Sequence, residues 1–374
     1  MMHQEKSRLK LKKSLALALM LAVLGIVSTV GFLRLRNSFP NVSAVEASGN
    51  VIVYWDENCS QKVNSIYWGG LSPGEARHVT VFVRNEGTDS CLLLLKPTSW
   101  NPPEVYQYLS FSWSYNANKI EAGNVAKVTQ VLKVSPSIKE ISSFSFSIIY
   151  EGKTHLALSD FNALFAENPN SRMIYPSDAS NKPLNCAPAM ASDWTASAFI
   201  YTKLAWVTEG LDTDAEFVNQ TTGKPKGNSG AAIVSFGGPC VNPIVKYAES
   251  ADTPQVDKAP IKFHVQGQLY QFIHQNGSNI EGAELPITVI NNDRDMFLIE
   301  IFTDGEGKYI MLCYGFGWKG TYAAGKYFHT TIYPNLELHN ESWIIVKWED
   351  TNQNGFVNTP GEGDTYTIIS KGNW

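Results

Sequence analysis

A glycine-rich loop, YGFGWKGTYA, follows an apolar segment and starts at Tyr314. Loops of this composition can bind phosphate, because glycines let backbone N–H groups approach the phosphate and a lysine neutralises its charge. A P-loop requires the lysine directly after the last glycine, and Ser or Thr directly after the lysine. Here Lys319 precedes Gly320 and Thr321, so the required order is absent.

The dinucleotide-binding fingerprint GxGxxG is matched literally by Gly315, Gly317 and Gly320. That fingerprint also requires a second strand that ends in an acidic residue about 20 residues further on. No such strand is predicted here, and the bulky Phe316 and Trp318 would crowd the approach of a cofactor. We therefore expect a structural turn from strand to helix and no bound nucleotide.

The segment DTNQNGFVN, which starts at Asp350, has the spacing of calcium ligands. Calcium loops carry oxygen ligands at alternate positions and a glycine at the sixth. Gly361 stands where an EF-hand has its glutamate, and strands are predicted on both sides, so we expect a β-flanked loop with a dissociation constant on the order of 10⁻⁴ to 10⁻³ M. The alternative is an Asn/Gly turn between two strands. The predicted calcium ligands are Asp350, Asn352, Asn354, the carbonyl of Phe356, Asn358 and Glu362.

Other patterns typical of catalysis are weak. The seven histidines are dispersed and lack the HExxH or HxH spacing of a zinc site. The GNSG segment at residues 227–230 is similar to a serine-nucleophile loop, but it has no acidic neighbour and no identifiable histidine partner. The sequence leaves open whether a pair of carboxylates for glycoside hydrolysis is present, because the distance between the two carboxylates is set by the fold. We expect a protein that is not an enzyme.

The composition indicates a β-rich chain that does not bind nucleic acid. Aromatic residues make up 12% and charged residues 17% of the 374 residues, and the net charge is −5. Binding to nucleic acid requires a basic face, and no cluster of Lys and Arg occurs beyond residue 36. The length allows two domains of roughly 150 residues each.

The N-terminus carries five basic residues between Lys6 and Lys13, followed by 20 uncharged residues from Ser14 to Leu33. A run of that length can span a bilayer, and two arginines follow it where a signal peptide would have its small-residue cleavage site. We favour an uncleaved signal anchor over a cleaved signal peptide. More basic residues precede the apolar run than follow it, which predicts a single-pass membrane protein with its N-terminus in the cytoplasm. The predicted segments are a cytoplasmic segment at 1–13, a transmembrane helix at 14–33 and a linker at 34–48, with the bulk of the chain outside the cell.

An extracellular chain can carry disulfides and N-linked glycans. The five cysteines lack the spacing of a zinc site. If each disulfide lies within one domain, Cys59 pairs with Cys91 and Cys186 pairs with Cys240. Cys313 then remains a buried free thiol. The sequons predict glycosylation at Asn41, Asn58, Asn219, Asn276 and Asn340.

Residues 49–152 predict an antiparallel β-sandwich. Apolar and polar residues alternate in HVTVFVRN, LSFSWSY and FSFSI, and turn signals separate these runs. Short strands with one apolar face pack as two sheets. The stretch LSPGEARHVTVFVRNEG resembles the opening strands of immunoglobulin-like modules of microbial surface proteins. That resemblance implies a spacer or adhesion module.

Residues 153–374 predict an α/β domain with a mixed sheet, which makes the chain α+β overall. Apolar runs bounded by glycine predict strands, and capping residues followed by helical spacing predict helices. Helices are expected after Ser192 or Asp193, after Pro243 and from Thr321 to Thr331; strands are expected near 171–178, 231–236, 261–265, 269–273, 285–290, 343–350 and 365–370, with a hairpin that turns at Asp304.

Two segments of this domain, IVSFGGPCVNPIVKY and YIMLCYGFGWKGTYAAGKYF, resemble paired elements of the C-terminal domains of archaeal S-layer proteins. In those domains a strand ends in a GGP loop before an Asn and a helix, and a later strand ends in Gly, then Thr, then a helix with two alanines. The matching residues are Gly237, Gly238, Pro239, Asn242, Gly315, Thr321, Ala323 and Ala324.

The resemblance implies a membrane-anchored structural protein of the archaeal cell envelope without catalysis. Its partners would be the membrane through residues 14–33, and other envelope or S-layer proteins or surface glycans. The alternative is a carbohydrate-binding or adhesion ectodomain, with a hydrolase as the less favoured choice.

Overall fold

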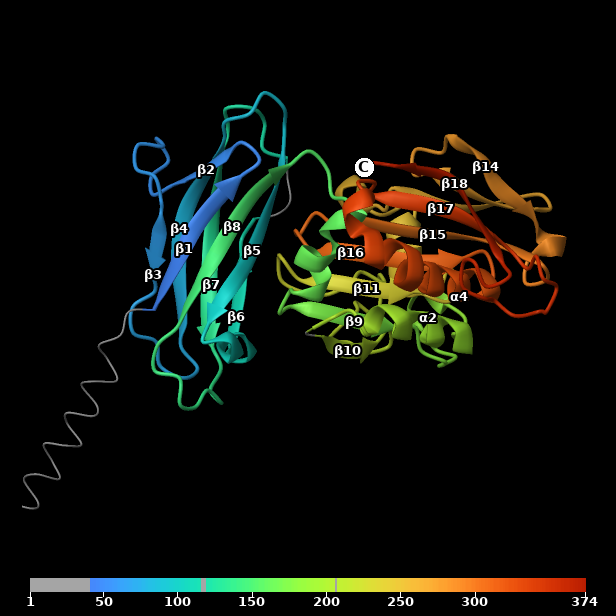
Figure 1. The fold of residues 1–374 in the computed structure, drawn as a ribbon, viewed down its shortest axis with the longest axis horizontal. Helices are drawn as coiled ribbons and strands as arrows, with labels where there is room; N and C mark the ends of the chain where they lie inside the picture. Colours follow the sequence, from blue (N-terminus) through green and yellow to red (C-terminus); the bar gives the residue numbers. More distant parts are fainter. Residues whose placement is uncertain (1–40, 116–118, 206) are drawn as a thin grey trace, which may run out of the picture.

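The computed structural model describes residues 41–115, 119–205 and 207–374. Two β-rich units lie side by side along the long axis of the molecule, and the chain passes from the first to the second after β8 (Figure 1). The first unit is a sandwich of two sheets with strand orders β3-β1-β8-β5 and β2-β4-β7-β6. Its strands are β1 (Val42–Ser48), β2 (Val51–Tyr54), β3 (Ser65–Tyr67), β4 (Ala76–Asn85), β5 (Leu92–Asn101), β6 (Leu109–Trp113), β7 (Val125–Val134) and β8 (Ser145–Lys153).

The alternation that predicted these strands is confirmed, because successive side chains of a strand point to opposite faces of the sheet. On β4, Val81 and Val83 are buried, while their neighbours are half-buried. On β6, Phe111 is buried; it makes an edge contact with Trp68 at a ring-centroid distance of 6.3 Å. Two features differ from the prediction: β1 pairs with β8 in parallel, and β1 occupies residues 42–48, which were expected to form a linker.

The second unit is built on a seven-stranded mixed sheet with the order β10-β9-β11-β16-β15-β17-β18. A three-stranded sheet, β12-β13-β14, packs beside it. The strands are β9 (Ser171–Tyr175), β10 (Thr208–Leu211), β11 (Ala232–Phe236), β12 (Ile261–Gln266), β13 (Leu269–His274), β14 (Asn279–Pro286), β15 (Arg294–Thr303), β16 (Tyr309–Gly315), β17 (Trp343–Glu349) and β18 (Thr365–Gly372). The α-helices are α2 (Ala191–Tyr201), α3 (Pro243–Glu249) and α4 (Trp318–Tyr327).

Short helical turns join these elements. The 3₁₀ turns are η1 (Pro103–Tyr108), η2 (Leu158–Asp160), η4 (Pro183–Asn185), η5 (Gln255–Asp257), η6 (Ile287–Val289) and η8 (Tyr333–Leu338), and the π-helical turns are η3 (Asn162–Ala166) and η7 (Phe328–Ile332).

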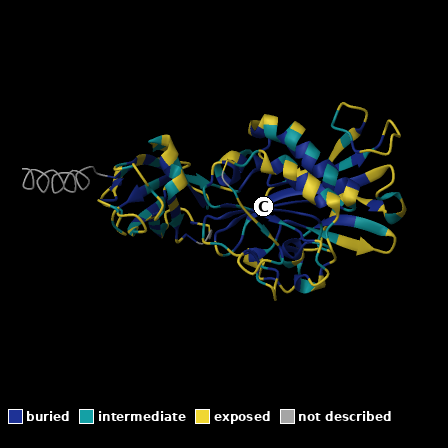
Figure 2. Cartoon of the chain, turned by 90° about the horizontal axis from the view of Figure 1, so that it is seen from below, coloured by how far each residue is buried: buried dark blue, intermediate teal, exposed yellow. Residues whose placement is uncertain are grey.

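The central strands of the mixed sheet are buried on both faces, as Figure 2 shows by the dark strands beneath the helices. Alternate residues of β16 belong to two different hydrophobic cores: Met311 and Cys313 face α2 and α4, whereas Ile310 and Leu312 face α3 and the three-stranded sheet. Parallel strands covered on both faces form continuous apolar runs in sequence. This explains why the run from Tyr309 to Tyr314 shows no polar alternation.

The helices α2 and α4 contact each other closely on one face of the sheet. A Cβ atom at Gly325 would lie 2.7 Å from the carbonyl oxygen of Ala196, so a side chain at this position would push the helices apart. The predicted helix starts lie within three residues of the observed ones, and α4 spans Trp318–Tyr327 where Thr321 to Thr331 was expected. Helix α2 begins at Ala191, because the Asp193 carboxylate accepts a hydrogen bond from the Met190 N–H (2.9 Å).

Strand makes up 40% and helix 19% of the residues that the structure describes, so this part of the chain is mostly β. The predicted class, α+β overall with an N-terminal transmembrane helix, is therefore wrong. The expected helices are short: α2 ends at Tyr201, although apolar helical spacing continues to Val207, and α4 gives way to the π-turn η7 after Tyr327. The segment expected as a strand at 285–290 is divided between the end of β14 and η6.

Within the described ranges, no helix has both the length and the apolar character needed to cross a membrane. This finding contradicts the predicted location as a single-pass membrane protein with a cytoplasmic N-terminus and an extracellular bulk, and that location is withdrawn. The predicted cytoplasmic segment at 1–13 and the anchor at 14–33 lie outside the described residues.

The two units share one hydrophobic core, which runs from Val51 in the sandwich to Val357 near the C-terminus. Polar contacts reinforce the junction: Asn170 donates from Nδ2 to the Phe111 carbonyl oxygen (2.8 Å), and Lys96 pairs with Glu167 (2.7 Å). The GNSG segment lies at this junction, where the Ser229 hydroxyl donates to the carbonyl oxygen of Tyr115. Its serine is therefore engaged in an interdomain contact.

Gly230 permits this close approach. Its φ is +81°, and a Cβ atom there would lie 2.7 Å from the ring of Trp113. We expect Gly230→Ala to lower the free energy of unfolding by about 2 kcal/mol more than Gly123→Ala does. Gly123 is the matched control, because its φ is +77° and nothing lies within 4 Å of its added Cβ atom. Urea denaturation of both variants measures the difference, and equal destabilisation would show that the junction tolerates the methyl group.

Candidate binding site at the carboxyl ends of β11 and β16

The segments IVSFGGPCVNPIVKY and YIMLCYGFGWKGTYAAGKYF lie next to each other in the sheet. Strands β11 and β16 are parallel neighbours, paired from Ala232–Tyr309 to Phe236–Cys313. The GGP loop follows β11 and leads to α3, whereas the glycine loop follows β16 and leads to α4. These helices pack on opposite faces of the sheet. A crevice outside the carboxyl ends of such strands is the usual ligand position in open α/β sheets.

A hollow of about 200 Å³ occupies this crevice. A second hollow of about 330 Å³ adjoins it and shares Met190 and Trp318. Both residues are exposed, and Trp318 retains 41% of its surface. Aromatic rings dominate the first hollow, and Phe316 stacks on Phe272 at a centroid distance of 4.4 Å. Its aromatic lining residues are Phe263, Tyr270, Tyr314, Phe316 and Trp318.

The amides of the glycine loop are already hydrogen-bonded within the protein. The Asp295 carboxylate accepts from the N–H groups of Gly317 (3.2 Å) and Gly320 (2.9 Å), and the hydroxyl of Thr321 accepts from Gly315 (3.0 Å). Helix N-termini bind anions because their first N–H groups lack partners. Here Asp295 takes the position that a phosphate would need.

Burial raises the pKa of Asp295 to about 7, while its N–H donors oppose that shift. Sequence reasoning missed this residue. The signal that could have found it is the position of this acidic residue at the start of the long apolar strand β15.

Lys319 is also used inside the fold. The side chain is 6% exposed, and its ammonium donates to the Asn292 carbonyl oxygen (2.7 Å). The same ammonium lies over the rings of Trp318 (5.6 Å) and Trp348 (5.5 Å). Such contacts with aromatic faces stabilise a desolvated cation.

Two buried glutamates bind the free edge of β12. The Ile261 N–H donates to Glu300 (3.2 Å), and the Phe263 N–H donates to Glu249 (3.0 Å). Glu249 also accepts a hydrogen bond from the Tyr314 hydroxyl. These carboxylates satisfy strand-edge donors that would otherwise be buried without partners. Burial raises the pKa of Glu249 to about 8, and burial together with the nearby Glu249 raises the pKa of Glu300 well above its usual value.

The hollow offers few groups for catalysis. Among its described lining residues, Asp193 is the one carboxylate, and burial raises its pKa to about 6. Glycoside hydrolysis uses two carboxylates on either side of the bond that breaks. The lining of this hollow is suited to holding an aromatic or apolar group beside one carboxyl group.

The predicted calcium loop is held by its own hydrogen bonds. Asp350 accepts from the N–H groups of Asn354 (3.2 Å) and Gly355 (2.8 Å). The side-chain oxygens of Asn352 and Asn354 accept from backbone N–H groups two residues on, and Glu362 accepts from the hydroxyl of Thr359.

Asp364, which was not among the predicted ligands, accepts from the indole N–H of Trp348 (2.7 Å) and from the N–H of Asn358 (2.7 Å). In the ranges that the structure describes, no three His, Cys, Asp or Glu side chains form a group that could hold a metal ion. The calcium site stays a prediction.

All five cysteines are free thiols in the structure, so neither predicted disulfide is present. Cys313 is buried as expected, and burial raises the pKa of its thiol. The Cys240 carbonyl oxygen accepts from the Ala187 N–H (2.8 Å), which keeps the chain segments of Cys186 and Cys240 together.

The predicted glycosylation sites differ in accessibility. Asn41 is buried, and its amide donates to the Gly69 carbonyl oxygen (2.8 Å) and accepts from the Phe144 N–H (3.1 Å). At 5% exposure, this side chain is enclosed by the fold and is not accessible to an oligosaccharide. The remaining sequons, Asn58, Asn219, Asn276 and Asn340, are exposed or half-exposed, and glycosylation there stays a prediction.

No family model matches the chain, and no curated protein sequence is similar to it. Among solved structures, the chain is similar to a family 123 glycoside hydrolase from Clostridium perfringens, with a TM-score of 0.15 and 8% sequence identity. The match covers 62% of this chain and 39% of the hydrolase chain. A similarity at that TM-score supports no conclusion about fold or activity.

The buried glutamates predict that stability falls as pH rises. A glutamate has a pKa of about 4.3 in an unfolded chain, whereas Glu249 has about 8 in the fold. Its stabilisation is therefore complete below about pH 4 and is lost as pH rises through 8. We expect the free energy of unfolding to fall by about 1 kcal/mol per pH unit between pH 5 and 8.

In Glu249→Gln that slope should be smaller, because the neutral amide does not titrate. The control is Glu281→Gln, which changes an exposed residue of the same three-stranded sheet. Urea denaturation at several pH values measures the slopes. An unchanged slope in Glu249→Gln would contradict the assignment.

The calcium prediction has a direct thermodynamic test. With a dissociation constant on the order of 10⁻⁴ to 10⁻³ M, 10 mM calcium should raise the free energy of unfolding by about 1.4 to 2.7 kcal/mol relative to a chelator. Asp350→Asn should abolish the increase, and magnesium should not reproduce it. A melting temperature unaffected by calcium in the unmodified chain would favour the Asn/Gly turn.

Proposed function

We propose that this chain is a non-catalytic structural protein of a cell envelope, of the S-layer-like kind. Its role would be to contribute a stiff body of two units to an assembly with other envelope proteins.

The observation that carries the proposal is the use of chemically capable groups within the fold. Asp295 and Lys319, which could serve an anionic ligand or a reaction, bind backbone groups at the start of α4 and in the loop before β15. Glu249 and Glu300 bind the edge of β12. These side chains satisfy buried backbone groups, and this use of them supports a structural role.

The junction between the units supports the same role. A core shared by both units, with the Asn170 and Ser229 hydrogen bonds across it, resists bending. Domain interfaces that are large and apolar oppose relative motion. Such a body can transmit force or hold a fixed spacing in an assembly.

The experiment combines location with activity. In fractionated source cells, an antibody to the chain should detect it in the envelope fraction together with other envelope proteins. The purified full chain should show no turnover in a hydrolase screen that includes glycosides, esters and peptides. Turnover that is abolished by Asp193→Asn, or detection only in the soluble cytosolic fraction, would overturn the proposal.

A further inference from the structure

The two adjoining hollows at the carboxyl ends of β11 and β16 are lined entirely by described residues. The first measures about 200 Å³ and the second about 330 Å³. Met190 and Trp318 line both hollows, so one ligand can occupy the two together. Their combined size lies within the range of roughly 300 to 1,000 Å³ typical of ligand sites.

The carboxylate of Asp193 lines the first hollow and has one oxygen without a partner in the protein. Asp193 is 3% exposed, and its Oδ2 accepts from the Met190 N–H (2.9 Å). Among the described residues, its Oδ1 accepts no hydrogen bond and the carboxylate forms no ion pair. Lys182, whose charge acts on this carboxylate, pairs with Asp212 (2.7 Å). Buried charges in proteins are normally paired, so a positively charged ligand would complete this site.

Aromatic rings form much of the remaining lining of the first hollow. The rings of Tyr270 and Phe316 stand at 72° with their centroids 5.9 Å apart, and those of Phe263 and Phe316 stand at 57° and 5.8 Å. All three residues are half-buried. In the described part of the chain, no cation lies over any of these three rings. Aromatic faces attract cations, and cages of such rings recognise quaternary ammonium groups.

The scarcity of hydrogen-bond acceptors in the first hollow selects the kind of cation. A primary ammonium has three N–H donors that need acceptors. The hydroxyl of Thr321 already accepts from the Gly315 N–H (3.0 Å), and the hydroxyl of Tyr314 donates to Glu249. A quaternary ammonium has no N–H groups, so its methyl groups can pack against the rings while the carboxylate balances its charge.

The second hollow suits an apolar chain attached to the ammonium. Trp318 is 41% exposed and Met190 is 54% exposed where the two hollows meet. Internal cations already lie over two rings of the second hollow: the ammonium of Lys319 is 5.6 Å from the Trp318 ring, and that of Lys326 is 5.1 Å from the Tyr322 ring. These rings therefore suit an uncharged chain better than a second cation.

We propose that the two hollows together bind an alkyl quaternary ammonium compound, with the cationic head beside Asp193 and the Tyr270 and Phe316 rings, and the alkyl chain across Trp318. The inference goes beyond the proposed structural role and does not rest on it, because an envelope protein and a free binding protein could both hold this ligand.

The test uses the full chain and two cationic probes, hexyltrimethylammonium and choline, with 3,3-dimethylbutan-1-ol as the neutral counterpart of choline. Isothermal titration calorimetry should find saturable binding of hexyltrimethylammonium with a dissociation constant below about 1 mM. Choline should bind about tenfold or more tightly than the neutral alcohol, because only choline interacts with the carboxylate and the ring faces as a cation.

Two variants separate the head from the chain. Asp193→Asn keeps an acceptor for the Met190 N–H and removes the charge, so it should weaken the binding of both cations by about tenfold or more. Trp318→Ala should weaken hexyltrimethylammonium more than choline, because choline has no long chain to place across the ring.

The matched control is Trp194→Ala, since Trp194 is 43% exposed on α2 and lines neither hollow. It should leave the affinity for both cations unchanged. Circular dichroism and thermal unfolding check that each variant is folded. Failure of hexyltrimethylammonium to bind at about 5 mM, equal affinity for choline and the neutral alcohol, or an equal loss in Trp194→Ala and Trp318→Ala would overturn the proposal.

Discussion

Burial of the mixed sheet on both faces is the constraint that most of the second unit satisfies. Helices cover one face, and α3 with the three-stranded sheet covers the other, so Ile261 at the start of β12 and Gly320 at the start of α4 are buried. Backbone N–H groups at these places still need acceptors. Asp295 supplies them at the start of α4, and Glu249 and Glu300 supply them along β12. The buried carboxylates are therefore a consequence of the architecture.

The same constraint explains the glycine loop. Between β16 and α4 the chain must turn tightly around the Asp295 carboxylate, and a Cβ atom at Gly320 would lie 2.5 Å from its oxygen. At Gly315 an added Cβ atom would meet the backbone of Gly320 at 2.4 Å. The glycines thus serve close internal packing, although the same residue types and spacing also occur in loops that cradle phosphate. In the structure, the Asp295 carboxylate beside the loop amides distinguishes this loop from a phosphate-binding loop.

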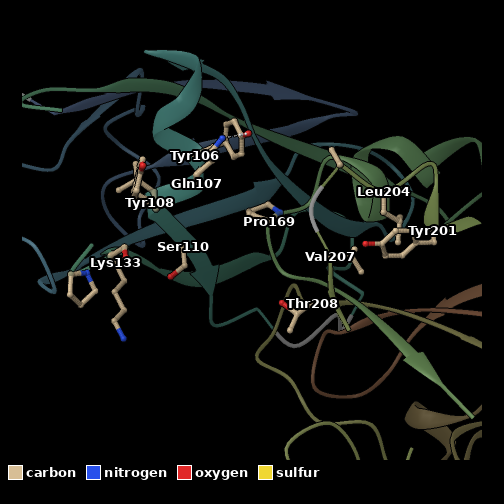
Figure 3. A pocket seen from close by; sticks show the side chains of 14 residues that line it. Tyr106, Gln107, Tyr108, Ser110, Lys133, Pro169, Tyr201, Leu204, Val207 and Thr208 are labelled. Carbon is tan, nitrogen blue, oxygen red and sulfur yellow. Dashed lines mark hydrogen bonds between the residues drawn. The ribbon is translucent and has the colours of Figure 1, made fainter. Parts of the chain in front are cut away.

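Much of the fold was predictable because the local signals were strong. Period-two alternation marked β4, β6 and β8, and Asn242 before Pro243 marked the start of α3, where its side chain accepts from the Ile244 N–H. The helix ends and the overall fold class were not predictable, because tertiary packing decided where α2 and α4 end. Asp295 and the groove between the two units (Figure 3) were not predictable either, because they depend on contacts between residues distant in sequence, such as Asn170 with Phe111.

The two concave regions differ in what they leave for a ligand. At the carboxyl ends of β11 and β16, most polar groups are bonded internally, and the remaining surface is aromatic with one carboxyl group. Between the units, residues of the sandwich and of the second unit together line a groove of about 710 Å³. The two units also share one hydrophobic core. A change that shifts the sandwich at Gly230 would therefore alter this groove without touching a residue that lines it.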